Sequence, residues 1–267
     1  MTLDDLTVVI IARDEQENLR QLLPNLWWAG AVLVVDNHSS DQTAKVAREA
    51  GAEVIESASD DFAQIRNEAV AQVTTEWVFY LDADERVTKE LRDEIVMALA
   101  DDDKRVAAWS MRRANYHYGY LMAHGGWDED WVVRIFRREC LRGWTGSIHE
   151  SPEWRGEMKK LHYPLLHLTH RDTAANLAKS SRWTIKEAQL LVAGGLPPVT
   201  KITILRKVVM EFYRRYWRDK GRKDGMAGFV ESLVQAFNRG FVYIQAWELQ
   251  QEPSIPERYE QLERQAK

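Results

Sequence analysis

The first hundred residues alternate between short apolar runs and segments with helical periodicity, and this alternation limits the fold more than any other feature. The apolar runs at residues 6–12, 31–37, 52–57 and 77–81 are predicted to be strands, with helices between them. Strands that are apolar on both faces are typical of a parallel sheet covered by helices. The sequence therefore predicts an α/β domain with a doubly wound, mostly parallel sheet, right-handed crossovers and helices on both faces.

Polar clusters follow three of the predicted strands. They read ARDE at residues 12–15, DNHSSD at 36–41 and DADE at 82–85. Ligands of such sheets bind beyond the carboxyl ends of the strands. We therefore expect the three clusters to lie along one edge of the sheet.

The last hundred residues have a different character. Three long helical stretches are separated by GGLPP and GRKDG. We expect an α/β domain over residues 1–170, with a first half over residues 1–104 and a second half over residues 105–170. A C-terminal helical region is expected over residues 171–267.

Composition excludes several classes of protein. The net charge of −5 argues against a nucleic-acid-binding protein that works by overall charge. The single cysteine, Cys140, excludes an internal disulfide, and we expect it to be a packed apolar side chain. The N-terminus lacks the pattern of a signal peptide, and the chain has no continuous apolar stretch of membrane-spanning length. We expect a cytoplasmic protein.

Asp82 and Asp84 form an Asp-x-Asp pair directly after a buried strand. In extended chain the side chains of residues i and i+2 point the same way, so the two carboxylates would face one pocket. A divalent cation such as Mg²⁺ or Mn²⁺ would offset their repulsion and bind substrate phosphates. The alternative is a strand that simply runs into a helix whose first turn favours acids. The pair alone does not decide between the two.

Four motifs together resemble the nucleotide-sugar domain of family 2 glycosyltransferases, which has the GT-A fold. They are VVIIARDEQENL, VVDNHSSDQT, QIRNEA and VFYLDADE, in that order. Further on, HGGWDEDWVVRIFRR, SIHE and LLHLTHRDTAANLAKSSRWTIKEA resemble the branch that includes lipopolysaccharide-core glucosyltransferases. The chain departs from that branch at His170, where an aromatic residue is expected.

The resemblance implies that residues 1–170 form a catalytic domain, with a nucleotide-sugar half over residues 1–104 and an acceptor half over residues 105–170. It also implies roles for residues along the predicted edge. Asp36 would hydrogen-bond the nucleotide base, Arg66 would approach the nucleotide, and Asp82 would lie near the ribose and the metal. The complete implied nucleotide-sugar set is Ala12, Arg13, Asp14, Asp36, Arg66 and Asp82.

The implied metal site is centred on Asp84, which would hold Mg²⁺ or Mn²⁺ on the diphosphate together with Asp82. A metal and an arginine would offset the negative charge that develops on the leaving nucleoside diphosphate. His149 is either a third metal ligand or a residue that shapes the pocket.

Transfer to a hydroxyl with inversion also needs a base on the face opposite the leaving group. Glu150 is our first candidate, because it stands where the resembled branch keeps a His-Glu pair. Asp130 is the second candidate, and its alternative role is an ion pair that orients Arg134.

Histidines and tryptophans around these motifs are expected to be mainly structural. His167 and His170 are predicted to be held by ordinary hydrogen bonds. Trp127, Trp131 and Trp144 are predicted to pack in the core, with one of them able to stack on an acceptor sugar.

Positive charge is concentrated in the C-terminal region. Residues 201–223 hold nine Lys or Arg against two acids, a net charge of +7, with aromatic and aliphatic residues interleaved. This pattern fits peripheral contact with the anionic inner face of a membrane. It fits equally a helix that packs its apolar side and leaves its charges in water.

Taken together, the motifs predict a metal-dependent, inverting glycosyltransferase. Its donor would be a nucleoside diphosphate sugar, with UDP favoured through the resemblance. Its acceptor would be a hydroxyl of a cell-envelope glycan or a lipid-linked molecule, and no nucleic acid is expected as a partner. Two alternatives are a haloacid-dehalogenase-type phosphatase, which also uses Asp-x-Asp, and a non-catalytic nucleotide-sugar binding module.

Overall fold

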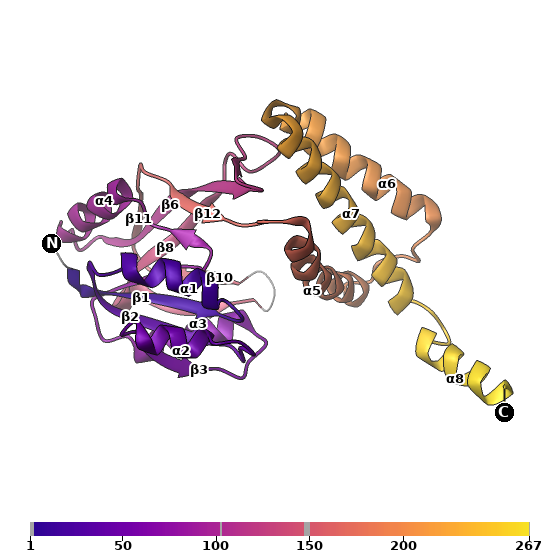
Figure 1. Cartoon of the computed structure of the whole chain (residues 1–267), viewed down its shortest axis with the longest axis horizontal. Coiled ribbons are helices and arrows are strands. Elements are labelled where there is room, and N and C mark those ends of the chain that lie inside the picture. Colours follow the sequence, from indigo (N-terminus) through magenta and orange to yellow (C-terminus); the bar gives the residue numbers. More distant parts are fainter. Residues whose placement is uncertain (1–2, 102, 147–149, 267) are drawn as a thin grey trace. The chain divides into compact units, whose positions relative to one another are not determined.

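The chain consists of two units in the computed structural model, which describes residues 3–101, 103–146 and 150–266 (Figure 1). The first unit comprises Met1–Ala114 and Glu129–Leu168, and the second comprises Asn115–Asp128 and Thr169–Lys267. The second unit therefore includes a segment, 115–128, that the sequence analysis assigned to the acceptor half of the catalytic domain.

Strands and helices alternate through the first part of the chain. The elements are β1 (Leu3–Ala12), α1 (Gln16–Leu22), η1 (Leu23–Asn25), β2 (Ala29–Asp36), α2 (Thr43–Glu49), β3 (Glu53–Glu56), α3 (Phe62–Gln72), β4 (Trp77–Tyr80), β5 (Glu85–Arg86) and α4 (Lys89–Ala100). Pro24 lies in η1, and α1 ends two residues before it because proline cannot supply the backbone N–H that the helix needs.

Strands predominate in the next part. These elements are β6 (Val106–His117), β7 (Tyr120–Leu121), β8 (Trp131–Arg137), η2 (Arg138–Cys140), β9 (Leu141–Thr145), β10 (Ser151–Trp154), β11 (Glu157–Lys160) and β12 (Leu165–Leu168). Strands β9 and β10 form a separate antiparallel pair.

The main sheet joins a parallel half to a mostly antiparallel half, in which β11 runs parallel to β6. Its order is β3-β2-β1-β4-β8-β6-β12-β5, with β7 and β11 paired to β6. Strands β1 to β4 are parallel, whereas β8 runs antiparallel to both β4 and β6. The strand order reverses beside β1, because β2 lies on one side of it and β4 on the other. Such a reversal is where open α/β sheets bind ligands.

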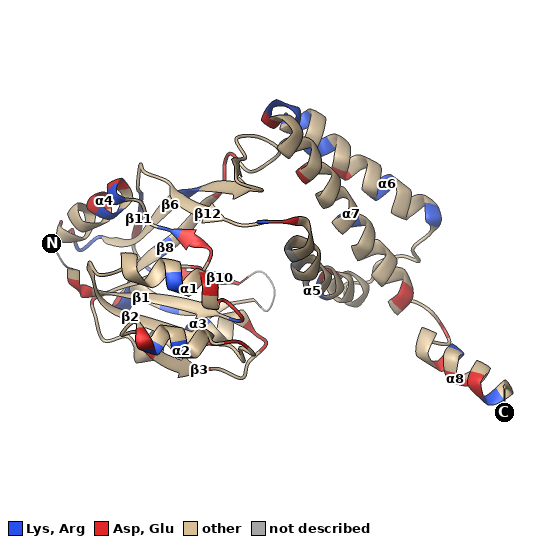
Figure 2. Cartoon of the chain, viewed as in Figure 1, with Lys and Arg blue, Asp and Glu red and all other residues tan. Residues whose placement is uncertain are grey.

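Two hydrophobic clusters cover the two faces of the sheet. On β1, Leu6, Val8 and Ile10 face one cluster, which includes residues of α1, α2 and α4, and Val9 faces the other, which includes residues of α3. Residues 6–12 and β4 carry no charged residue (Figure 2). Burial on both faces explains why these strands are almost continuously apolar. It confirms the predicted mostly parallel α/β sheet with helices on both faces.

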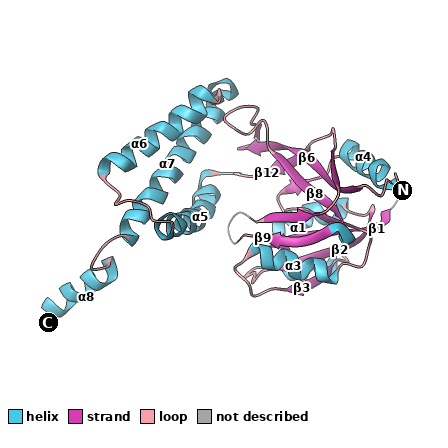
Figure 3. Cartoon of the chain, turned by 180° about the vertical axis from the view of Figure 1, so that it is seen from behind, coloured by secondary structure: helices cyan, strands magenta, loops and turns pink. Residues whose placement is uncertain are grey.

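The second unit is mainly helical (Figure 3). Its elements after β12 are α5 (Thr173–Ala193), α6 (Lys201–Tyr213), the π-helical η3 (Arg214–Arg218), η4 (Gly221–Asp224), α7 (Gly225–Leu249) and α8 (Ile255–Gln265). A small core of residues from α5 and α7, with Val199, joins these helices. Helices α6 and α7 approach closely at Gly240, where a Cβ would lie 2.8 Å from Val208 Cγ2. No helix in the described part of the chain is long and apolar enough to span a membrane.

Candidate active site

The polar clusters predicted to share an edge follow strands of the parallel half. Asp36 ends β2 and lies opposite Ala12 in the register of β1 and β2. Asp82 and Asp84 come directly after β4, which is the other neighbour of β1. Because these strands are parallel, their carboxyl ends meet at one edge of the sheet.

Asp36 presents a buried acceptor at this edge. Its residue is 7% exposed, and its Oδ1 has no hydrogen-bond partner among the described residues. Next to it, the Asn37 side chain donates to the carbonyls of Ser57 and Ser59, at 3.1 and 2.8 Å. A buried carboxylate oxygen without a donor is costly, so a ligand that brings an N–H to Asp36 would be favoured.

The loop after β1 is tied to the loop after β2. Asp14 has a left-handed backbone conformation with φ 57°, and its Oδ1 accepts from the backbone N and the Oγ of Ser40, at 2.7 and 2.9 Å. The backbone hydrogen bond from Ser40 lowers the pKa of Asp14. Arg13 is half exposed and lies 3.8 Å from Asp60. In this structure Asp14 holds the loops together, and Ala12, which is buried, ends the strand beneath them.

The Asp-x-Asp segment is a turn and not extended chain. The backbone N–H of Glu85 donates to the carbonyl of Asp82 at 2.9 Å. The expected extended chain is therefore wrong here, and a shared pocket for the two carboxylates stays a prediction. Asp82 pairs with Arg134 and lies 3.7 Å from Arg66, whereas Asp84 Oδ2 lies 3.5 Å from His167 Nε2.

Arg134 is the buried centre of a charge network. Its Nη2 pairs with Asp82 and lies 2.6 Å from Oε1 of Glu85, which is fully buried. Burial alone would raise the pKa of Asp82, but Arg134 and Arg66 lower it below its usual value. Burial raises the pKa of Glu85, and the arginines around it offset only part of that effect. Glu85 also accepts from the backbone N–H of Asp82 at 2.9 Å, so it holds the start of the turn.

Arg66, on α3, is the second cation of the site. Its side chain is 8% exposed and lies 3.2 Å from Glu150 Oε1 and 3.7 Å from Asp82 Oδ1. The guanidinium stacks over the rings of Trp144 and Tyr80, at 4.6 and 5.3 Å from their centroids. Burial raises the pKa of Tyr80 to about 12, so its hydroxyl stays protonated and donates to the Arg66 carbonyl. These contacts fix the cation beside Asp82.

Both candidate bases are paired with arginines. Glu150 binds Arg66 and so belongs to the same cluster as Asp82. Asp130 forms a two-point ion pair with Arg113, at 2.8 and 3.1 Å. The alternative role that we gave Asp130, orientation of Arg134, stays a prediction.

The structure describes one of the two histidines predicted near the site, His167, but not the other, His149. His149, predicted as a third metal ligand, lies outside the described residues. His167, predicted to be structural, lies on β12 beside Asp84, because β12 pairs with β5, the strand that follows the Asp-x-Asp turn. Sequence reasoning missed this residue, since the pairing of strands 80 residues apart has no local signal.

The three tryptophans have different environments. Trp144 is buried against Tyr80 and Phe136, as expected of a core residue. Trp131 is 38% exposed, with the Lys160 ammonium 4.3 Å from its ring centroid. Trp127 belongs to the second unit.

A family model named Glycosyl transferase family 2 matches residues 7–154, more than half of the chain. The chain belongs to this family. Membership confirms the expected GT-A fold and the enzyme class of glycosyltransferase. It excludes the phosphatase alternative, because the match includes the Asp-x-Asp segment.

Among individual proteins, the family 2 enzyme is similar to the lipopolysaccharide core biosynthesis glycosyltransferase LpsC of Rhizobium meliloti. The two are 26% identical, over 86% of this chain and 87% of LpsC. An uncharacterized glycosyltransferase of Rickettsia bellii is 23% identical, over 88% and 83% of the two chains. The likeness to LpsC confirms the resemblance to the lipopolysaccharide-core branch.

Two solved structures are also similar to this family 2 enzyme. The mannosyltransferase PcManGT from Pyrobaculum calidifontis, in complex with GDP-Man and Mn²⁺, matches with a TM-score of 0.47 and 17% identity, over 91% of this chain and 72% of that one. Glucosyl-3-phosphoglycerate synthase from Mycobacterium tuberculosis matches with a TM-score of 0.42 and 14% identity, over 72% and 79%.

The charge network predicts a large stability effect at Arg134. Replacing it by methionine (Arg134→Met) leaves Glu85 and Asp82 without their main cation, and should lower the free energy of unfolding by about 3–5 kcal/mol. Urea unfolding followed by circular dichroism measures this change.

Arg48→Gln is the matched control, because Arg48 pairs with Glu56 at the surface. It should change the free energy of unfolding by less than about 0.5 kcal/mol. Adding Glu85→Gln to Arg134→Met should restore part of the loss. Equal urea midpoints for Arg134→Met and wild type would contradict the central role of Arg134.

Proposed function

We propose that this enzyme is an inverting glycosyltransferase that moves a sugar from a nucleoside diphosphate sugar to a hydroxyl of a cell-envelope glycan or lipid-linked acceptor. The observation that carries this proposal is the arrangement after β4, where Asp84 pairs with His167, and Asp82, two residues earlier, pairs with Arg66 and Arg134. A UDP sugar is preferred through the resemblance to the lipopolysaccharide-core branch.

The residues after β4 fit a divalent cation. Asp84 Oδ2 and His167 Nε2 are 3.5 Å apart, and their side chains are 17% and 12% exposed. Donor atoms bound to one ion through bonds of about 2.1 Å lie about 3 Å or slightly more apart, so a small side-chain movement suffices. A carboxylate with an imidazole favours Mn²⁺ over Mg²⁺, because nitrogen ligands suit the softer transition ions. The bound cation would neutralise the diphosphate as the sugar leaves.

Asp82 has a different role in this proposal from its neighbour in the motif. Its carboxylate is engaged by Arg134 and faces Arg66, so it positions the two cations and not the metal. The arginines would stabilise the charge that grows on the leaving diphosphate. Asp36 would accept a hydrogen bond from the base through its buried Oδ1.

Metal-dependent binding of UDP tests the donor site. Asp84→Asn should weaken UDP binding in the presence of Mn²⁺ by about tenfold or more, because it removes an anionic ligand. His167→Gln should weaken Mn²⁺-dependent binding more than Mg²⁺-dependent binding, because it removes the nitrogen donor. Isothermal titration calorimetry with UDP and each ion gives these affinities.

His162→Gln is the matched control, because the His162 side chain is 92% exposed and pairs with Glu94. It should bind UDP like wild type with either ion. If Asp84→Asn and His167→Gln both kept the wild-type affinity with Mn²⁺, the proposed metal site would be wrong.

Glu150 is the proposed base. Its pairing with Arg66 keeps it among the charged groups of the site, whereas Asp130 forms its ion pair with Arg113, which lies 3.6 Å from Glu85. As a carboxylate it can accept the proton of the attacking hydroxyl, and direct displacement then inverts the anomeric centre.

Glu150→Gln should lower the rate of transfer by about 10²- to 10⁴-fold, while UDP binding changes little. Transfer is measured with labelled UDP sugars and core-truncated lipopolysaccharide, and nuclear magnetic resonance of the product reports inversion. Asp130→Asn should retain most of the activity. The assignment fails if Asp130→Asn shows the large loss and Glu150→Gln does not.

Peripheral membrane association is the further part of this proposal, and an exposed face of α6 supports it. Ile202, Leu205, Val209, Met210 and Tyr213 are 69%, 65%, 64%, 58% and 61% exposed, and recur at helical spacing. A helix that buried its whole apolar side in the protein would not leave these side chains in water. A bilayer interface would cover them.

The charges on this segment have the sign that an anionic membrane attracts. Lys201, Arg206, Lys220, Arg222 and Lys223 are exposed, and Figure 2 shows basic residues along α6. Each basic residue near an anionic surface contributes about 1 kcal/mol. Other basic residues of the segment are engaged within the protein, because Arg214 and Arg215 pair with Glu211.

Vesicle sedimentation tests the association. Wild type should sediment with phosphatidylglycerol vesicles at low salt and be released as salt rises. The combined change Leu205→Gln, Val209→Gln and Tyr213→Gln should abolish sedimentation, because it removes the apolar face. Changing Met97, which is 68% exposed on α4, to Gln is the control and should have no effect. Wild type that stays in the supernatant at low salt would refute membrane association.

A further inference from the structure

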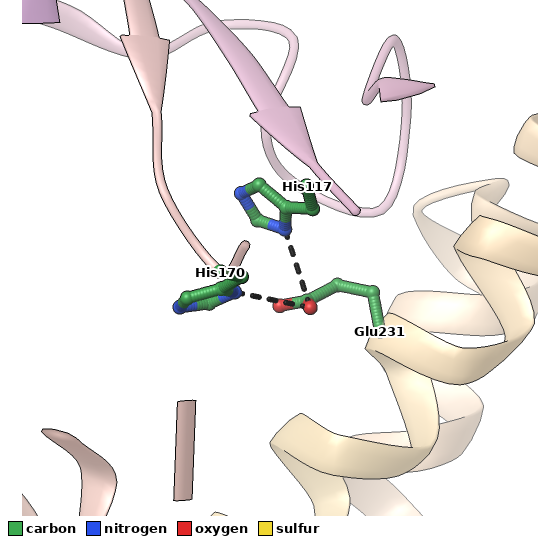
Figure 4. Close-up of side chains that lie close together, drawn as sticks. All are labelled: His117, His170 and Glu231. Carbon is green, nitrogen blue, oxygen red and sulfur yellow. Dashed lines mark hydrogen bonds and ion pairs between the residues drawn. The ribbon is translucent and has the colours of Figure 1, made fainter. Parts of the chain in front are cut away.

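Three side chains from distant parts of the sequence converge in the second unit. His117 ends β6, His170 follows β12, and Glu231 lies on α7. Figure 4 shows both imidazole rings directed at the carboxylate, with dashed lines to it. None of the three belongs to the candidate active site.

The distances within this cluster suit a small metal ion. Nδ1 of His117 and Nδ1 of His170 lie 3.2 and 3.1 Å from Glu231 Oε2. The donor atoms of all three residues lie within 4.8 Å of one another. A tetrahedral zinc site with bonds of about 2.0–2.1 Å has edges of about 3.3 Å, so two edges are nearly in place. The third edge, between the two imidazole nitrogens, would reach this length by a small rotation of one ring.

The cluster is buried and supported from outside. The side chains of His117 and Glu231 are 0% and 2% exposed, and that of His170 is 13% exposed. Gln235, one turn further along α7, donates to the other carboxylate oxygen, Oε1, at 2.8 Å. Trp127 packs edge-on against the His117 ring at 4.6 Å. Outer contacts of this kind orient metal ligands in proteins.

The backbone conformation of His170 is also unusual. His170 has φ 47°, in the left-handed region that residues with a Cβ seldom adopt. Its carbonyl accepts from the backbone N–H of Tyr118 at 3.0 Å, which joins the segments that carry the two histidines. A cavity of about 220 Å³ within this unit is lined by His170 and Gln235. One of the three residues, His170, therefore borders open space within the unit.

We propose that His117, His170 and Glu231 bind a divalent transition cation of the zinc class. Two imidazoles and one carboxylate form a set that suits Zn²⁺ and disfavours Mg²⁺, which prefers oxygen ligands. A water molecule would complete the fourth position. The bound ion joins the end of β6, the segment after β12 and α7, and so stabilises the second unit. This site is separate from the nucleotide-dependent metal site at Asp84 and needs no nucleotide.

The competing explanation is a hydrogen-bonded group in which both imidazoles donate to Glu231 and no ion binds. The two explanations differ in their response to Glu231→Gln. A glutamine still accepts hydrogen bonds through its amide oxygen, but it lacks the negative charge that a zinc ligand supplies. Zinc affinity therefore separates them, even where stability changes alike.

The test uses the full-length protein, stripped with a chelator and titrated with Zn²⁺ alone at neutral pH. Wild type should bind one Zn²⁺ per chain at this cluster without nucleotide. Its Tm should rise by about 5–10 °C when the free ion is at about 100 times Kd. Glu231→Gln and His170→Gln should each weaken this binding by about 100-fold or more. Co²⁺ in place of Zn²⁺ should give the visible absorption of tetrahedral coordination in wild type but not in Glu231→Gln or His170→Gln.

Two controls separate this site from other ligands. Asp84→Asn should bind Zn²⁺ at the cluster like wild type, so this result does not depend on the proposed donor site. His162→Gln, a change at an exposed histidine, should also bind like wild type. The proposal is overturned if stripped wild type binds no Zn²⁺, or if Glu231→Gln binds Zn²⁺ as tightly as wild type. Either result would leave the cluster as a hydrogen-bonded group only.

Discussion

The buried ion pair of Arg134 with Asp82 and Glu85 is the interaction on which the first unit's site depends. Arg134 lies on β8, which runs antiparallel to β4 beside it in the sheet. Both acids lie just after β4. A buried guanidinium between two carboxylates leaves little freedom to either strand end, because breaking the pair would leave buried charges without a partner and without water. The turn after β4 is therefore held in place before any ligand binds.

That constraint divides the Asp-x-Asp motif into two functions. Asp82 is engaged by the arginines, whereas Asp84 pairs with His167. In our proposal the cations and the metal then act together on one diphosphate. Preorganised charges of this kind need no rearrangement as the leaving group gains charge. Membership of glycosyl transferase family 2 gives this arrangement its chemical context.

The second unit raises a separate question of stability. Its described core is small, and much of α6 is exposed. Two interactions would compensate for the small core and the exposed helix, and each rests on a different physical effect. A membrane interface would cover the apolar face of α6. A cation at the cluster of His117, His170 and Glu231 would join three segments of the chain by bonds that a small core does not supply.

The parallel sheet, its helical layers and the edge that carries Asp36 and Asp82 could be predicted from the amino-acid sequence alone, because strand burial and strand order leave local patterns in it. The sequence also indicated Glu150 as the leading base, through the resemblance. Only the tertiary structure showed that Asp84 meets His167, because a turn replaced the extended chain that we expected and β12 returned to it from far along the sequence. Side chains that meet through such long-range pairing carry no periodicity or spacing that a sequence can display.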